Sequence, residues 1–303
     1  MVDPLSQSVT PKSEPKLRHE FVGMMFAVTI AEVGIQTAGL VQAGSWVHFL
    51  PAYGHLVLAT VVIATSWVGW TLSVAPGARR DVEKIFQWEF LVLVLDVSLV
   101  IVYFIVVRSV DFAERNSPRV APASTVAAWI LAIFCLYLLW DVLTKVIIYW
   151  KYRDKSEKSL RRHYGSSWWR NQGARMVPTL VCVILAWVIW RQVGGADSPH
   201  RLTADFALLS LVLLFRALKE FISAWIPREP QAHPEAFLKR TKWPLLWTLA
   251  CVVGMAIGIL WTRNWPLPDR IATAIRAEMP TETRHSEDVR TTQQPEHRKV
   301  DKK

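Results

Sequence analysis

Apolar residues recur in seven long stretches along the chain, separated by shorter polar segments. Each stretch is about as long as a helix must be to cross a hydrocarbon core of roughly 30 Å. The stretches occupy residues 20–41, 54–75, 86–108, 126–150, 177–195, 204–226 and 243–262. We therefore predict an all-α protein, a polytopic transmembrane helical bundle of about seven spans. Because Arg216, Lys219 and Glu220 interrupt the sixth stretch, an amphipathic helix lying in the membrane interface is the alternative there.

The composition and charge of the chain agree with a membrane location. Hydrophobic residues make up 52% of its 303 residues, and the 20% that are charged collect in the loops and tails. The net charge is +10, and Lys and Arg concentrate before the first stretch and after the second, fourth and sixth. Because basic residues remain on the cytoplasmic side, we predict a cytoplasmic N-terminus and a multi-pass protein of the cell inner (plasma) membrane. The basic tail after Arg263 is an exception, since seven spans place it outside.

Three segments follow from this pattern. We predict a disordered cytoplasmic tail over residues 1–19, a transmembrane helical domain over 20–262, and a polar, disordered tail over 263–303. The cytoplasmic loop 151–175 holds eight Lys and Arg residues, which favours contact with anionic lipids. The alternative is a docking site for an anionic cytosolic ligand, such as a nucleotide or oligonucleotide. The residues concerned are Arg161, Arg162, His163 and Arg170.

The sequence contains no pattern typical of a catalytic or metal site. A nucleophile elbow, an HExxH motif and a phosphate-binding glycine loop are all missing, so we expect no enzymatic activity and no cofactor. Cys135, Cys182 and Cys251 lie inside apolar stretches without paired spacing, and we interpret them as small buried hydrophobes. A retinal protein needs a lysine in the middle of its last helix, whereas Lys242 lies at the edge of the last stretch.

Ionisable residues inside the apolar stretches are the candidates for function, because each is costly in a membrane. Thr29, Glu32 and Gln36 form one polar stripe at helical spacing, which must face a neighbouring helix or a water path. Val28 lies one turn before Glu32 on nearly the same face. In a purely structural interpretation, Glu32 is a buried acid bonded to a polar group of another helix. Asp96 in the third stretch is more consistent with a hydrogen bond between helices than with a proton carrier.

Two further pairs of charged residues have a spacing of four. Asp141 and Lys145 in the fourth stretch lie on one helix face and can neutralise each other, as can Arg216 and Glu220 in the sixth. We interpret both pairs as structural.

The first two stretches resemble the endolysosomal potassium channel family. The similarity is carried by Phe21, the pair Phe26-Ala27 with the following Val28, and Trp67 in the second stretch. By this resemblance, Val28 corresponds to the branched apolar side chain that narrows the pore in that family. The resemblance implies a tetramer with the first helix of each subunit lining a central pore, as in the bacterial relatives. Val22 and Gly23 replace the Ser and Asp of the family motif, and Trp70-Thr71 replace its histidines, which weakens any inference about potassium selectivity.

From the residues and the resemblance together, we expect an oligomeric, cation-conducting membrane channel, gated by a cytosolic anionic ligand or partner. Copies of Val28 make an apolar constriction, and copies of Glu32 one turn away make an acidic ring, with Thr29 and Gln36 lining the same path. One alternative is a proton-coupled secondary transporter that uses Glu32 and Asp96 as coupling carboxylates. The other is a non-conducting membrane anchor that recruits a partner through its cytoplasmic loop.

Overall fold

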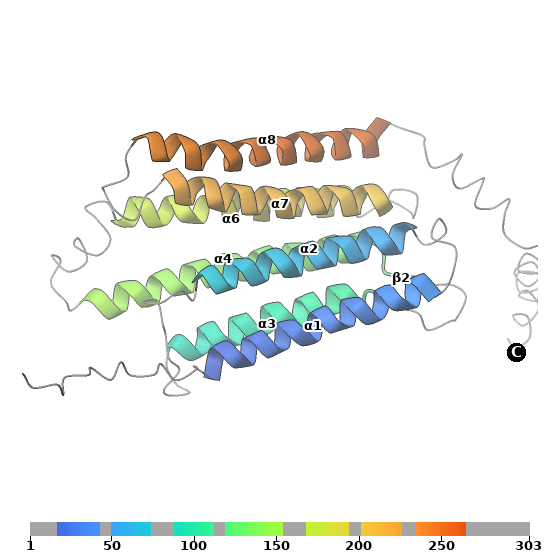
Figure 1. Ribbon diagram of the computed structural model, residues 1–303, viewed down its shortest axis with the longest axis horizontal. Coiled ribbons are helices and arrows are strands. Elements are labelled where there is room, and N and C mark those ends of the chain that lie inside the picture. Colours follow the sequence, from blue (N-terminus) through green and yellow to red (C-terminus); the bar gives the residue numbers. More distant parts are fainter. Residues whose placement is uncertain are drawn as a thin grey trace, which may run out of the picture. The chain divides into compact units, whose positions relative to one another are not determined.

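The structure of the chain is a computed structural model, in which the described residues are 17–42, 50–73, 88–111, 119–153, 168–193, 201–225 and 234–264 (Figure 1). The described part contains seven α-helices and one pair of very short strands. The helices are α1 (Leu17–Gln42), α2 (Leu50–Ser73), α3 (Trp88–Arg108), α4 (Ala123–Arg153), α6 (Trp168–Val193), α7 (Arg201–Trp225) and α8 (Pro234–Asn264). The all-α prediction is therefore confirmed.

Five of these helices are long and apolar enough to cross a membrane. The segments concerned are Glu20–Gln42, Leu50–Thr71, Phe90–Arg108, Ala123–Ile147 and Gly173–Val193. In α8 the apolar segment Trp243–Ile257 is shorter, and α7 contains charged residues. Helices are the expected form because hydrocarbon offers no partner for an unpaired backbone N–H or C=O group. The count of seven spans and the cytoplasmic N-terminus stay predictions.

Several helices extend beyond the apolar stretches. Leu17–His19, which the sequence places in the N-terminal tail, belong to α1 in the structure, and α8 continues to Asn264. The predicted loop 151–175 is shorter at both ends, because α4 runs to Arg153 and α6 begins at Trp168. A helix does not end where its apolar residues end, since its polar last turns can extend into the interfacial region.

The helices up to α7 pack in two rows of three. One row consists of α1, α2 and α7, and the other of α3, α4 and α6; each helix contacts its neighbours within the row and a helix of the other row (Figure 1). α7 stands at the end of its row and packs against α2, α4 and α6, so it belongs to the bundle despite its charges. Residues up to Thr262 belong to one structural unit.

Contacts between side chains give the directions of the helices. Phe26 of α1 meets Tyr103 of α3, and Glu32, further along α1, meets Arg108 at the end of α3, so these two helices run parallel. Asp96 of α3 meets Trp140 of α4, whereas Tyr103, further along α3, meets Tyr137, so α3 and α4 run antiparallel. Helices α1 and α3 thus point one way and α4 points the other way.

The core between the rows is apolar and closely packed. Its large, fully buried side chains include residues of α1, α2, α3, α4 and α7: Leu40, Leu58, Ile63, Val92, Tyr103, Val106, Ile130, Phe134, Leu208 and Leu211. Gly54 lets α2 approach α7, because a Cβ atom at this position would lie 2.9 Å from a methyl carbon of Leu202. Strands β1 (Val110–Asp111) and β2 (Arg119–Val120) pair antiparallel and connect α3 to α4.

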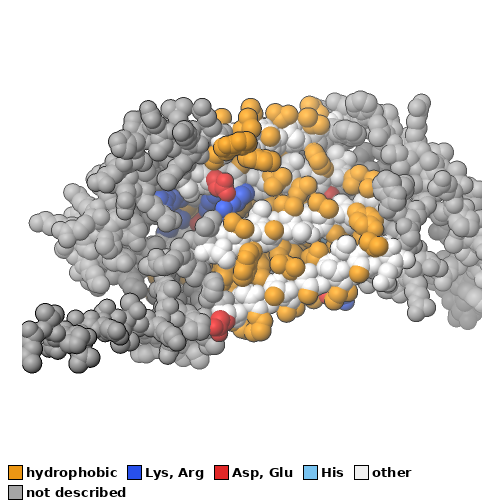
Figure 2. All heavy atoms as spheres, in the orientation of Figure 1, with side chains coloured by type: hydrophobic (Ala, Val, Ile, Leu, Met, Phe, Trp, Pro, Cys, Tyr) orange, Lys and Arg blue, Asp and Glu red, His pale blue; other side chains and the backbone are white. Residues whose placement is uncertain are grey.

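The outer surface of the described helices is rich in large apolar side chains. Met24, Ile35 and Val41 of α1 are each more than 60% exposed, and Trp243 and Leu246 of α8 are similarly exposed. Figure 2 shows hydrophobic side chains distributed over the described part of one face. Such extensive apolar exposure is unusual for a protein in water and is what contact with acyl chains requires. Together with the five apolar helices, it indicates a membrane-embedded protein.

Candidate functional site: a buried charge cluster between α4, α6 and α7

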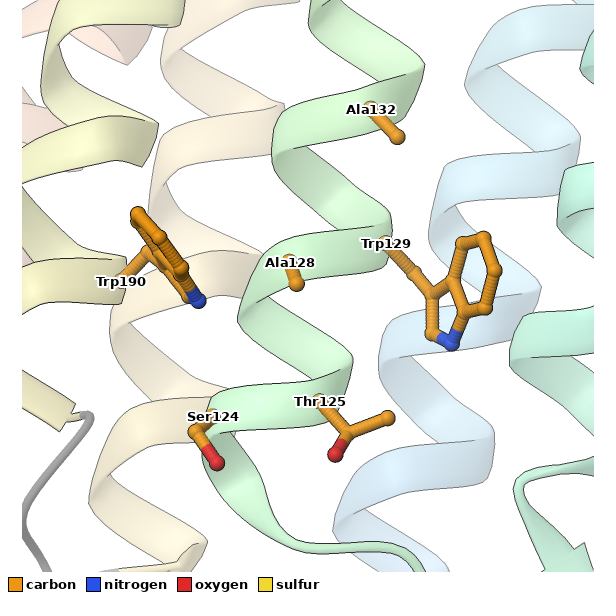
Figure 3. A pocket seen from close by; sticks show the side chains of 6 residues that line it. All are labelled: Ser124, Thr125, Ala128, Trp129, Ala132 and Trp190. Atoms are coloured by element: carbon orange, nitrogen blue, oxygen red, sulfur yellow. The ribbon is translucent and has the colours of Figure 1, made fainter.

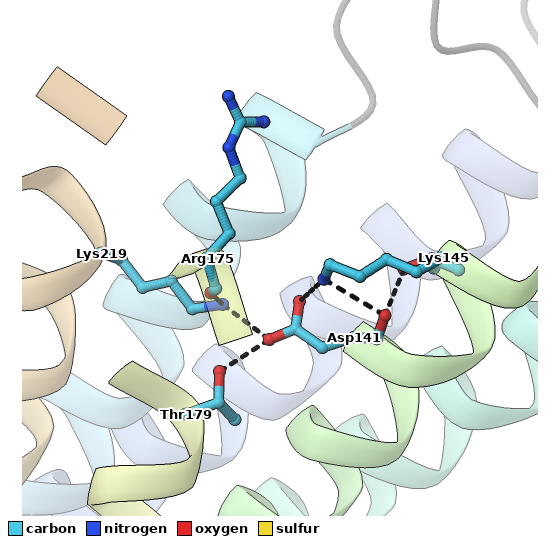
Figure 4. A network of polar contacts seen from close by, with 6 residues as sticks. Asp141, Lys145, Arg175, Thr179 and Lys219 are labelled. Carbon is cyan, nitrogen blue, oxygen red and sulfur yellow. Dashed lines mark hydrogen bonds and ion pairs between the residues drawn. The ribbon is translucent and has the colours of Figure 1, made fainter. Parts of the chain in front are cut away.

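Asp141 of α4 is the centre of a cluster of charged and polar groups inside the bundle. Its carboxylate Oδ2 accepts hydrogen bonds from Lys219 Nζ of α7 at 2.6 Å and from Thr179 Oγ1 of α6 at 2.6 Å. Its Oδ1 accepts one from Lys145 Nζ at 3.3 Å, one turn further along α4. Three helices therefore direct donors at one carboxylate (Figure 4).

The cluster holds more positive than negative charge. Two ammonium groups, those of Lys145 and Lys219, form ion pairs with the single carboxylate of Asp141. The side chains of Asp141 and Lys145 are 11% and 13% exposed, so this excess charge lies well inside the bundle. The side chain of Lys219 is 27% exposed, so this residue of the cluster is partly accessible from the surface of the bundle.

The local structure of α6 helps to hold Lys219. Pro178 lies inside this helix and lacks an N–H group, so it cannot donate to the carbonyl four residues earlier. Lys219 Nζ donates to the carbonyl oxygen of Arg175 in the same turn, at 3.3 Å. An ammonium group from α7 thus contacts the backbone of α6 one residue after Ala174, whose carbonyl loses its helical donor to the proline.

A second polar group lies between α2, α3 and α4. The hydroxyl groups of Tyr103 and Tyr137 are 2.7 Å apart, and Tyr137 donates to Ser66 Oγ at 2.5 Å. Close by, Trp140 Nε1 donates to Asp96 Oδ1 at 3.0 Å. Asp96 therefore takes part in a hydrogen bond between helices, as its structural interpretation expected.

A third polar group lies near the opposite end of the bundle. His55 Nε2 is 2.6 Å from the carbonyl oxygen of Val106, and its Nδ1 is 4.0 Å from Asp205 Oδ1. Both side chains are almost completely buried. Neither residue was singled out from the sequence, although a histidine and an aspartate near the ends of apolar stretches are the available signal.

The predicted stripe on α1 faces the interior of its own chain. Thr29 and Gln36 are buried, and Gln36 Nε2 donates to Glu32 Oε1 at 2.7 Å. Arg108 Nη1 donates to the same oxygen at 3.0 Å, so the charge of Glu32 is paired. Val28 is 57% exposed on the outer face of α1, away from this stripe. The structure thus brings Glu32 and Gln36 together and separates Val28 from them.

Of the residues that carry the resemblance to the potassium channel family, the structure brings only some together. Phe26 is buried, and its ring lies 5.1 Å from that of Trp67, edge to face. Trp70 and Tyr103 complete this aromatic cluster at 6.3 Å and 6.0 Å from Phe26. Phe21 is 43% exposed, outside the cluster. These aromatic contacts hold α1, α2 and α3 together.

Other predicted residues are placed as follows. Arg216 Nε lies 2.8 Å from Glu220 Oε1, so this i,i+4 pair forms as predicted. Cys182 and Cys251 are buried but Cys135 is exposed, contrary to the expectation for that residue. Within the described helices, no group of His, Cys, Asp and Glu side chains could hold a metal ion.

Arg170 is part of α6, whereas Arg161, Arg162 and His163 lie outside the described residues.

A shallow cavity of about 350 Å³ lies on the surface of α4 and α6. Ser124, Thr125 and two alanines of α4 line it between Trp129 and Trp190 (Figure 3). No charged side chain points into it, so it lacks the convergent polar groups that a specific binding site needs. The cluster around Asp141 is therefore the stronger candidate site.

Comparison with known proteins does not add a family. No protein-family model, curated protein or solved structure matches this chain. The resemblance to endolysosomal potassium channels thus stays a prediction from the residues alone.

Proposed function

We propose that this protein transports an ion or a small charged solute across a membrane, through the interior of its own helical bundle. The observation that carries the proposal is the Asp141 cluster, in which Lys145 and Lys219 meet one carboxylate inside a bundle of apolar helices. The helices of the bundle expose many apolar side chains on their outer surface, which supports a location in a membrane.

Energetic cost argues for a role beyond packing. A charged side chain costs about 2.5–3.5 kcal/mol on insertion scales at the bilayer centre, and less toward the ends of a span. Asp141 and Lys145 lie in the last third of the apolar segment Ala123–Ile147, so their cost is below this value. A buried ion pair typically offers no more stability than apolar side chains of the same size. Helix packing alone needs neither Asp141 nor its two lysines, whereas a path for a charged solute needs charged groups inside the bundle.

Flux measurements on purified full-length protein in liposomes test this proposal. We expect the protein to collapse a potassium chloride or proton gradient, detected with a voltage-sensitive or pH-sensitive dye. Asp141→Asn and Lys219→Met should each lower the flux by about tenfold or more, the change that corresponds to about 1.4 kcal/mol. Glu220→Gln is the matched control, because it changes a half-exposed acid on the same helix as Lys219. Wild-type flux that survives both cluster substitutions contradicts this route, and absence of any flux supports a non-conducting anchor.

The second candidate is the oligomeric cation channel with α1 at a shared axis. The observation that favours it is the outward face of α1, where Ala27, Ala31, Gly34 and Ala38 are exposed at successive helical turns. Among the described residues, no atom of another helix lies within 4 Å of where a Cβ atom on Gly34 would be. Small residues at this spacing let helices approach closely in membranes, which supports contact between copies of α1.

In that assembly, Val28 remains the proposed constriction. Glu32 is a weaker candidate for a cation-attracting ring, because Arg108 offsets its charge. Val28→Ala should produce a leak and Glu32→Gln should lower cation conductance, with a tetramer in mass measurements of the detergent-solubilised protein. A monomeric protein whose currents are unchanged in both variants refutes the assembly. Gating through the basic segment around Arg161 belongs to this candidate, as do the cytoplasmic N-terminus and the inner-membrane location.

A further inference from the structure

We infer that the Asp141 cluster binds a small monovalent anion together with one proton. The inference rests on the proposed function, since it names the solute class that this site takes. In the resting arrangement, the Asp141 carboxylate itself occupies the position between two ammonium groups. When Asp141 is protonated, an external anion of similar size takes over that role.

The geometry of the contacts carries this exchange. Lys219 and Lys145 contact different oxygens of the carboxylate, at 2.6 Å and 3.3 Å, and Thr179 donates to the oxygen that Lys219 contacts. Protonating Asp141 removes the one negative charge that these two ammonium groups share, while its neutral carboxyl group stays in place. An anion then binds beside this carboxyl group, where the long side chains of Lys145 and Lys219 can turn toward it. A carboxylate or a halide fits such a set of donors, because each accepts several hydrogen bonds with a single negative charge.

Other charged groups on the helices packed against α4 leave this position to Asp141. Asp96 of α3 accepts a hydrogen bond from Trp140, and Glu220 of α7 is paired with Arg216. Arg175 of α6 contributes its backbone carbonyl, which accepts from Lys219, whereas its guanidinium group points away from Asp141 (Figure 4). Among the described side chains, Asp141 is the one acid in an ion pair with Lys145 or Lys219.

Charge balance sets the stoichiometry. With Asp141 ionised, it carries one negative charge beside the two positive charges of Lys145 and Lys219. With Asp141 neutral and one monovalent anion bound, the same total charge remains inside the membrane. Charge neutrality of the exchange keeps its electrostatic cost low, so one proton and one anion enter together. A divalent anion would change this balance and is disfavoured.

Lys219 provides the route by which an anion reaches the site. With 27% of its side chain exposed, it is the most accessible of the three charged members, whereas Asp141 and Lys145 are more deeply buried. An anion that arrives at Lys219 meets the cluster without first displacing the more buried pair.

Anion binding to purified wild-type protein tests the inference without any substitution. Chloride and acetate are the two probes, added to the full-length protein in detergent in a weakly buffered solution with a pH dye. We expect uptake of about one proton per anion bound, and an affinity that falls roughly tenfold for each pH unit above the titration of Asp141. Binding without proton uptake, or no binding of either probe, overturns the inference.

Two variants sharpen the test. Asp141→Asn keeps the shape of the side chain without its charge, so it should bind chloride at neutral pH at least about tenfold more tightly than the wild type and independently of pH. Lys219→Met should lose binding, whereas Glu220→Gln, which changes a neighbouring but separate pair, should leave it unaltered. A folded Asp141→Asn protein with no gain in affinity contradicts the proposal.

The outcomes for binding and for transport are distinct. Proton-coupled anion binding with no flux in liposomes refutes the proposed transport and leaves the binding site standing. Flux that depends on Asp141 with no anion binding refutes the binding site and leaves transport standing.

Discussion

Replacing Lys219 by methionine tests how much the ion pair between Lys219 of α7 and Asp141 of α4 stabilises the folded protein. Met has a similar length and no charge, so the substitution removes the 2.6 Å ion pair to Asp141 while retaining most of the packing. Removing one partner of a fully buried ion pair costs about 3–5 kcal/mol. Lys219 is 27% exposed and Asp141 keeps Lys145 and Thr179, so we expect a smaller loss of about 1–3 kcal/mol in the free energy of unfolding.

A double-mutant cycle isolates the interaction energy. Unfolding of Lys219→Met, Asp141→Asn and the double variant by SDS in mixed micelles can be followed by the fluorescence of the 16 tryptophans. We expect a favourable coupling of at least about 1 kcal/mol between the two positions. The Arg216–Glu220 pair on the same helix is the control, and because Glu220 is half exposed, Glu220→Gln should cost less than about 1 kcal/mol. If Lys219→Met is no more destabilising than Glu220→Gln, the cluster is not a buried ion pair of this kind.

Substitutions at three other positions, with a control at a fourth, test the packing of the bundle. Gly54→Ala should cost no more than about 1 kcal/mol, since the end of the flexible Leu202 side chain can move, whereas Gly54→Leu should separate α2 from α7 and cost about 1–3 kcal/mol, measured by SDS unfolding. Phe26→Ala should lower stability by about 3 kcal/mol, and a matched Phe21→Ala, at an exposed position, should cost far less. Tyr137→Phe should cost about 1–3 kcal/mol by removing hydrogen bonds to α2 and α3, which thermal unfolding monitored by circular dichroism would detect; a neutral effect means those bonds are not formed.

The polar stripe of α1 illustrates how far helical periodicity reaches. A turn of about 100° per residue places Thr29, Glu32 and Gln36 within roughly 60° of one another, so a shared face could be predicted. The same geometry places Val28 about 100° from Thr29, at the margin of that face. The structure turns the stripe inward together with the buried apolar side chains of Val22, Phe26 and Leu40, and it leaves Val28 on the exposed side.

The charged residues of α4 and α7 show the same division. The spacing of four made both the Asp141–Lys145 and Arg216–Glu220 pairs predictable, because residues one turn apart always lie close on a helix. Lys219 was visible only as a charge in an otherwise apolar stretch. Its pairing with Asp141, 78 residues away, depends on which side of α7 faces α4, and no local spacing specifies that rotation.

By itself, the sequence determined that this chain forms long apolar helices, because length and hydrophobicity alone decide whether a segment can satisfy its backbone groups in hydrocarbon. It also determined which residues would be costly inside a membrane and which pairs of them would meet within one helix. Only the tertiary structure decided the partners across helices: Arg108 for Glu32, Lys219 and Thr179 for Asp141, and Asp205 for His55. Those contacts depend on the order and rotation of packed helices, and these result from the fit of all buried side chains together.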